Sequence, residues 1–109
     1  MSSKYFIDFL IKKLSAKLNF LEQNMPVISR FFGIVIIMYW NDHNPPHIHA
    51  KYGEYNAIIS ISGEFLGGDF PHRASALVLE WIRRHTSELL DNWQRAASGE
   101  PIRPIEPLE

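Results

Sequence analysis

Three of the five histidines lie within a stretch of seven residues, His43, His47 and His49. Asp42 directly precedes them, and a Pro-Pro pair stands between the first histidine and the other two. An imidazole can bind a divalent metal or exchange a proton near neutral pH, and a carboxylate can assist in both roles. Because the prolines restrict the shapes of this segment, we interpret it as the candidate catalytic site.

The spacing of His47 and His49 predicts that both side chains leave the same face of a strand, while Ile48 points toward the core. Together with His43 and Asp42 on the preceding loop, they could hold zinc or another divalent metal with one position open for water. Without a metal, two imidazoles of unequal pKa could act as general base and general acid in phosphodiester transfer to a 2′-hydroxyl. A structural role, with the imidazoles bonded to backbone carbonyls, is the third alternative.

Arginines recur every eleven residues further along the chain, at Arg73, Arg84 and Arg95. Glu80 and Asp91 each precede an arginine by four residues, the order that favours ion pairs within a helix. We therefore expect Arg84 and Arg95 to be paired with these carboxylates. Arg73 has no such partner, and we expect it to contact a phosphate group of the substrate.

The composition excludes several kinds of site. The 109 residues include no cysteine, which rules out disulfides, a cysteine nucleophile and thiolate zinc ligands. With 11 basic and 12 acidic residues, the net charge of −1 argues against nucleic-acid binding by bulk charge. The longest apolar run, residues 34–40, is far shorter than the roughly 20 residues of a membrane helix. We expect no integral membrane segment and no signal peptide.

The hydrophobic patterns predict an α+β fold. Residues 27–67 are typical of a small antiparallel sheet of three or four strands, which Gly67 and Gly68 would end. Residues 71–98 predict one long helix packed on that sheet, with His85 as a core histidine and His72 in the first turn. The alternative is two helices with a break near Thr86-Ser87. The tail, residues 101–109, contains three prolines and is expected to be extended.

Residues 3–22 predict an additional amphipathic helix with a leucine- and isoleucine-rich stripe. We expect this helix to pack on its own domain or on a second copy of the chain, which would make a homo-oligomer. The alternative is that it binds a membrane surface or another protein. Because Met25 begins a second plausible start, we assign residues 1–24 to an extension and residues 25–109 to a single α+β domain with a proline-rich tail.

The motif D-H-x-P-P-H-x-H-A, residues 42–50, lies in a longer stretch, Met25–Leu108, that resembles a small prokaryotic family known as domain of unknown function 4160. The further residues that carry the resemblance are Met25–Ile34, Met38-Tyr39, Asn41, Tyr52, Arg73-Ala74, Val78, Glu80-Trp81 and Asn92-Trp93. The N-terminal extension lies outside this pattern.

The family has no settled activity, but the gene pairs in which its members occur imply a role. Members of the family tend to be encoded beside a protein of unknown-function family 2442, in pairs that look like toxin–antitoxin modules. The resemblance therefore implies a cytoplasmic toxin with a cognate antitoxin-like partner, acting as a histidine-dependent ribonuclease on RNA or as a metal-dependent hydrolase. The alternative is a non-catalytic, protein-binding adaptor in which the histidines are structural.

Overall fold

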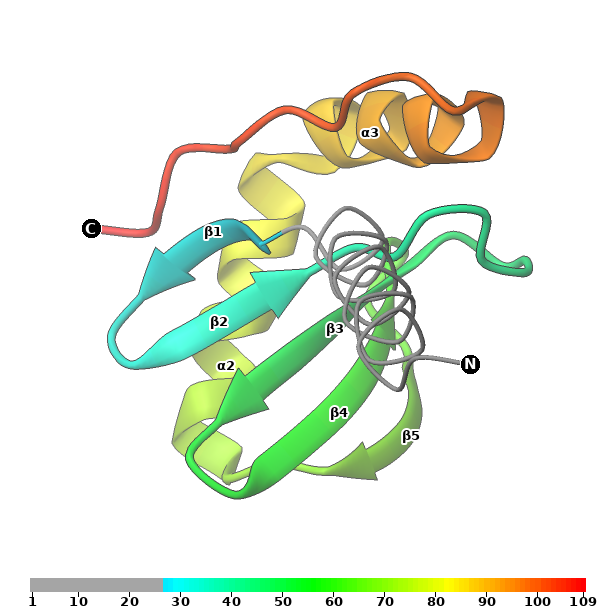
Figure 1. The fold of residues 1–109 in the computed structure, drawn as a ribbon. Helices are drawn as coiled ribbons and strands as arrows, with labels where there is room; N and C mark the ends of the chain where they lie inside the picture. Colours follow the sequence, from blue (N-terminus) through cyan, green and yellow to red (C-terminus); the bar gives the residue numbers. More distant parts are fainter. Residues whose placement is uncertain (1–26) are drawn as a thin grey trace, which may run out of the picture.

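The chain forms one antiparallel sheet and two helices in the computed structural model, which describes residues 27–109 (Figure 1). The five strands lie side by side in chain order. They are β1 (Val27–Phe31), β2 (Ile34–Ile37), β3 (His47–Tyr52), β4 (Tyr55–Ser60) and β5 (Phe65–Asp69). The helices α2 (His72–Arg84) and α3 (Thr86–Ser98) follow. The α+β class is confirmed.

The sheet has five strands, so the prediction of three or four was wrong. β1 and β2 are joined by Phe32 and Gly33, whose φ angles of 50° and 79° make the tight two-residue turn that hairpins favour. A phenylalanine seldom adopts positive φ, so this turn carried no sequence signal. Gly67 and Gly68 do not end the sheet but lie within β5, where Gly68 passes close to the β4 backbone.

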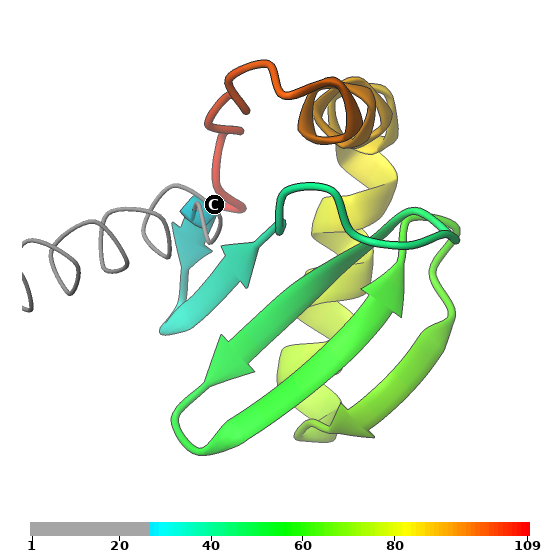
Figure 2. The ribbon, with the colours of Figure 1, turned by 45° about the vertical axis from the view of Figure 1, so that its right-hand side comes forward.

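One face of the sheet packs against α2 and forms the core (Figure 2). Alternate residues of the three central strands are buried there: Ile34, Ile36, Ile48, Ala50, Ala57 and Ile59. From α2, Val78, Trp81 and Ile82 meet them, each at most 1% exposed. The period-two alternation of β3 therefore leaves the other side of the strand for His47 and His49.

The segment after the sheet forms two helices, so the favoured prediction of one helix over residues 71–98 was wrong and the alternative with a break near Thr86-Ser87 is confirmed. The chain turns at His85, whose φ of −125° and ψ of 24° are not helical, and α3 runs in a different direction from α2 (Figure 1). The Thr86 hydroxyl donates to the carbonyl of Ile82, a bond that competes with the backbone ladder and bends helices. No proline or glycine marks the break.

The tail, residues 101–109, is extended as predicted and is held down at three places. The Asn92 amide exchanges two hydrogen bonds with the Arg103 backbone, and the Trp81 indole donates to the carbonyl of Glu106. The Ile105 N–H donates to the carbonyl of Ile28 in β1, 2.8 Å away. The tail is therefore part of the folded domain.

The predicted helix over residues 3–22, the extension to residue 24 and an oligomer formed through that helix lie outside the described residues. Within residues 27–109, neither helix is long enough and apolar enough to cross a membrane.

Candidate active site

The loop between β2 and β3 is tied to the domain at both ends. The Asn41 N–H donates to the carbonyl of Ala96 in α3, and the Pro46 carbonyl accepts from the N–H of Ile61, at 3.2 and 3.0 Å. Asn41 has a φ of 53°, a conformation that asparagine tolerates better than most residues. The peptide bond between Asn44 and Pro45 is cis. These ties fix Asp42 beside the first residues of β3.

Three side chains converge at this end of β3. Asp42 Oδ2 lies 2.9 Å from His47 Nε2 and 3.5 Å from His49 Nε2. The two imidazole rings leave the same side of the strand, with 5.2 Å between their centroids, while Ile48 and Ala50 point into the core as the strand periodicity predicts. The structure therefore places two imidazoles and one carboxylate around a common point, which we call the Asp42–His47–His49 cluster.

His47 is the most enclosed member of this cluster, with 4% of its surface exposed. Its Nδ1 lies 2.7 Å from the Pro45 carbonyl oxygen, which can only accept, so Nδ1 carries the proton. Its Nε2 then faces Asp42 either as a second donor, in an imidazolium, or with a lone pair free for a metal. Trp93 of α3 packs beside the ring with centroids 5.1 Å apart. The orientation of His47 is therefore fixed from two sides.

His49 presents a nitrogen that the protein does not use. Its Nε2 is buried and has no hydrogen-bond partner among the described residues, and Asp42 Oδ2 lies 3.5 Å from it. The Tyr39 ring meets the imidazole edge-on, 4.4 Å between centroids. Burial lowers the pKa of His49, and the charges of His47 and Lys51 lower it further against the opposing pull of Asp42. His49 is therefore neutral at neutral pH and keeps a lone pair.

Asp42 supplies the negative charge of the cluster. Burial raises the pKa of this carboxyl, but hydrogen bonds from the His43 N–H and from His47, together with the charge of His47, bring it below its usual value. The His43 N–H bond, 2.9 Å long, goes to Oδ1 and leaves Oδ2 facing the two imidazoles. Asp42 is therefore an ionised carboxylate with one oxygen directed into the cluster.

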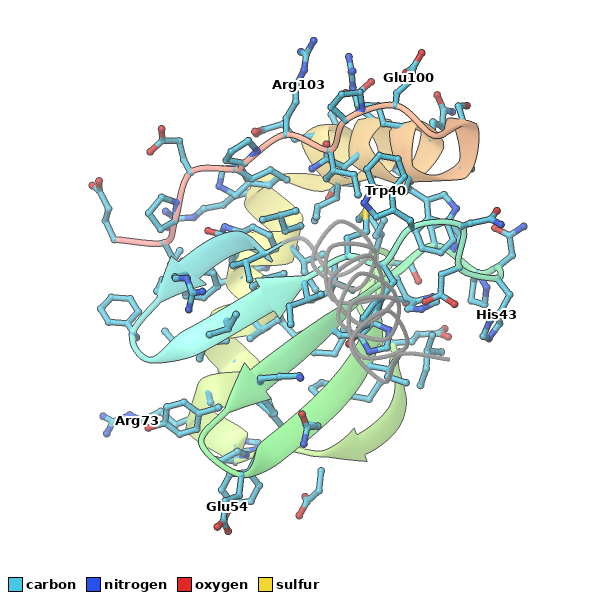
Figure 3. The ribbon with its side chains drawn as sticks, viewed as in Figure 1. Trp40, His43, Glu54, Arg73, Glu100 and Arg103 are labelled. Atoms are coloured by element: carbon cyan, nitrogen blue, oxygen red, sulfur yellow. The ribbon has the colours of Figure 1, made fainter. Side chains whose placement is uncertain are left out.

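The other two predicted site residues, His43 and Arg73, are not members of the cluster. The His43 side chain is 90% exposed and lies at the rim of the cluster, with its Nδ1 3.0 Å from Asp42 Oδ1 and its ring centroid 5.9 Å from that of His47. Arg73 lies in the first turn of α2, on the opposite side of the molecule from His43 in Figure 3. The structure does not bring Arg73 to the cluster, so the expected phosphate contact there has no geometric support.

Several titratable residues of the helices form local pairs. Arg84 meets Glu80 and Arg95 meets Asp91, both at 2.8 Å, as the spacing predicts. His85, expected to be a core histidine, lies at the helix break, bonded to Glu88 and next to Trp81. His72 is exposed in the first turn of α2.

Two contributors to the cluster were missed from the sequence. The Pro45 carbonyl, which sets the tautomer of His47, gives no side-chain signal. Trp93 reaches His47 only because α3 turns away from α2, so the prediction of one continuous helix did not indicate this contact. Tyr39 contacts His49 edge-on.

The Asp42–His47–His49 cluster fits a divalent transition metal. Ligand atoms around a tetrahedral zinc lie about 3.4 Å apart, given metal–ligand distances of about 2.1 Å. The distances from Asp42 Oδ2 are 2.9 and 3.5 Å, and the three candidate ligand atoms lie within 4.8 Å of one another. A carbonyl that accepts from the far nitrogen of a metal-binding histidine, as Pro45 does for His47, is the usual support of such sites. Two nitrogens and one oxygen would leave coordination positions for water or substrate.

Comparison with known proteins identifies one family. A family model described as a domain of unknown function, DUF4160, matches residues 33–94, more than half of the chain, and this range includes the whole cluster. No curated protein and no solved structure matches the chain.

Proposed function

This chain belongs to the DUF4160 family, and we propose that it is the toxin of a two-gene toxin–antitoxin module, acting as a hydrolase that uses a divalent metal held by Asp42, His47 and His49. The observation that carries the metal is the buried, unpartnered Nε2 of His49, directed at a carboxylate and a second imidazole. The toxin role rests on the gene pairing that the family resemblance implies, and a cognate antitoxin-like protein is the expected partner.

Each residue has a distinct task in this proposal. The hydrogen bond to the Pro45 carbonyl fixes the orientation of the His47 ring, so that its Nε2 already points at the metal position. His49 offers a neutral imidazole because its pKa is lowered by burial, and Asp42 offers an ionised oxygen. A divalent metal at this position would polarise a phosphoryl oxygen and lower the pKa of a bound water. In hydrolysis, the water would lose a proton as its oxygen bonds to phosphorus, the P–O bond to the leaving ribose oxygen would break, and that oxygen would take up a proton.

The different surroundings of the two histidines favour a metal-free ribonuclease as the second candidate. In the absence of metal, both nitrogens of His47 face acceptor oxygens, those of Pro45 and Asp42. His49 is neutral in the same place. One imidazole could then remove the proton of a 2′-hydroxyl while the other protonates the leaving oxygen, whose bond to phosphorus breaks as the 2′-oxygen bonds to it.

Metal analysis of the purified full chain separates these two candidates. We expect bound transition metal by elemental analysis, and binding of zinc or manganese by the chain after EDTA treatment. The substitution His49→Gln should abolish this binding while leaving the melting temperature close to that of the parent, because Nε2 makes no hydrogen bond with residues 27–109 that could be lost. His72→Gln, which changes an exposed histidine of α2, is the matched control. A chain that binds no metal but needs His49 for activity would support the acid–base candidate instead.

Controlled expression with and without the neighbouring gene tests the toxin role. We expect growth arrest that the neighbour relieves and that His49→Gln abolishes. If the parent chain has no effect on growth and the histidine substitution changes only stability, the adaptor alternative replaces the proposal.

A further inference from the structure

The face of the sheet opposite α2 carries two basic residues, Arg30 and Lys51, on the same side as His49 of the cluster. The strand register aligns Arg30, Val35, Lys51, Asn56 and Asp69 in one row across all five strands. The neighbouring residues of the central strands, Ile36, Ala50 and Ala57, pair with one another and are buried toward α2. Because side chains alternate along a strand, Arg30 and Lys51 project from the face that also carries His49.

The distances along this face are short. Lys51 follows His49 by two residues on β3, a separation of about 7 Å at the usual rise of a strand. Arg30 lies two strands away in the same row as Lys51, about 10 Å at the usual strand spacing. In the next row on this face, His49 lies between Ile37 of β2 and Ile58 of β4. The cluster therefore sits at one end of a face that combines cations with apolar side chains.

The two cations of this face have no carboxylate partner among residues 27–109. Arg84 and Arg95 are each in an ion pair, whereas Arg30 and Lys51 form none with a described residue. Arg30 is exposed and Lys51 is half-buried. The only acidic member of their row is Asp69, on the far edge strand β5. A local positive potential therefore lies next to the cluster although the net charge of the chain is −1.

We propose that this face binds the backbone of single-stranded RNA, with Lys51 and Arg30 contacting phosphates that flank the one at the cluster. The inference deepens the proposed function and rests on it for the identity of the reacting phosphate. A single strand fits better than a duplex because its unstacked bases can contact the half-buried Val35, between the two cations, and the half-buried Ile58, beside His49. A duplex would offer these apolar residues only its phosphates and sugars.

The test measures RNA binding separately from cleavage. Fluorescence anisotropy with a labelled single strand of about 12 nucleotides is recorded for the full chain in the His49→Gln background, where the reaction centre is disabled. Each lost phosphate contact should lower the salt slope of log affinity by about 0.7. Lys51→Gln and Arg30→Gln should therefore each weaken binding about eightfold at about 50 mM salt, and this difference should vanish near about 1 M salt.

Two arginines outside the face provide the comparison. Arg83→Gln removes the same charge from an exposed position on α2 and should leave affinity unchanged. Arg73→Gln tests the contact expected from sequence alone and should also have no effect. If Lys51→Gln and Arg30→Gln bind like the background chain, or if Arg73→Gln or Arg83→Gln loses as much affinity as they do, the proposal is overturned.

The outcome is distinguishable from that of the proposed function. Binding that depends on Lys51 and Arg30, in a chain whose parent cleaves no RNA, would support the RNA-binding face and reject the hydrolase. If the parent cleaves RNA, and Lys51→Gln and Arg30→Gln cleave it at the same rate when the RNA is subsaturating, the result would support the hydrolase and reject the RNA-binding face.

Discussion

Replacing Asp42 with asparagine should separate the chemistry of the cluster from its structure. The new amide oxygen can still accept from the His43 N–H, and the new amide NH₂ can donate to His47 Nε2, while His47 Nδ1 keeps its bond to Pro45. The cost is the difference between a charge-assisted hydrogen bond, about 1.5–3 kcal/mol, and a neutral one, about 0.5–1.5 kcal/mol. We expect the free energy of unfolding, measured in urea with EDTA present, to fall by about 1–1.5 kcal/mol.

The effect of Asp42→Asn on metal binding should be much larger. The substitution removes the only anionic member of the cluster, and an amide NH₂ facing the metal position is not a ligand. Changes that merely disturb the support of a ligand cost about 10–100-fold in metal affinity. Loss of the ligand itself should therefore cost at least about 100-fold, measured by calorimetric titration with zinc.

The matched variant is Asp42→Ala, which leaves the buried Nε2 of His47 without a partner. It should cost about 1–3 kcal/mol more than the asparagine variant, because an unsatisfied buried polar group carries its full desolvation penalty. Zinc affinity in Asp42→Asn equal to that of the parent would refute the assignment of Asp42 as a ligand. Equal destabilisation by asparagine and alanine would refute the hydrogen-bond reasoning.

Three further predictions concern pH, the tail and the sheet. Without metal, the free energy of unfolding should decrease as pH falls below 6.5, the ordinary pKa of histidine, because His49 has a lowered pKa in the folded state and takes up a proton on unfolding. Urea titrations at several pH values should show a weaker decrease for His49→Gln than for the parent. An identical decrease in the two chains would contradict this. Asn92→Ala should cost about 2–4 kcal/mol in urea denaturation, since it breaks both hydrogen bonds to the Arg103 backbone, and a loss below about 1 kcal/mol would show that the tail is not anchored there. Gly68→Ala should reduce the thermal midpoint, because the added Cβ would lie 2.8 Å from the Cα of Ala57 in a backbone with φ of 88°; an unchanged midpoint would mean that β5 can shift away from β4.

Local features of the fold and site were predictable from the sequence. The two-residue spacing of His47 and His49 sets their common face through strand geometry alone, and the four-residue spacing before Arg84 and Arg95 sets their ion pairs. Both patterns act over a single element. The proline-containing loop was likewise visible, although its ties to Ala96 and Ile61 were not.

The features that could not be predicted depend on contacts between distant residues. The pairing of β5 through two glycines becomes favourable only because Gly68 lets the strand approach the β4 backbone closely. The distance of Arg73 from the cluster follows from the direction in which α2 runs along the sheet (Figure 3). A helical repeat of arginines contains no information about which end of the helix faces the sheet's candidate site.

The break between α2 and α3, where one continuous helix was predicted, also shapes the candidate site. If α2 continued as a straight helix beyond His85, residue 93 would lie about 12 Å further along the α2 axis, at a rise of 1.5 Å per residue. Instead α3 turns across the end of the sheet, so that Trp93 packs on His47 and the Ala96 carbonyl receives the N–H of Asn41. The same turn therefore supplies both the wall behind His47 and one anchor of the loop that carries Asp42. A substitution that straightened the helix would disturb the cluster without altering any of its three residues.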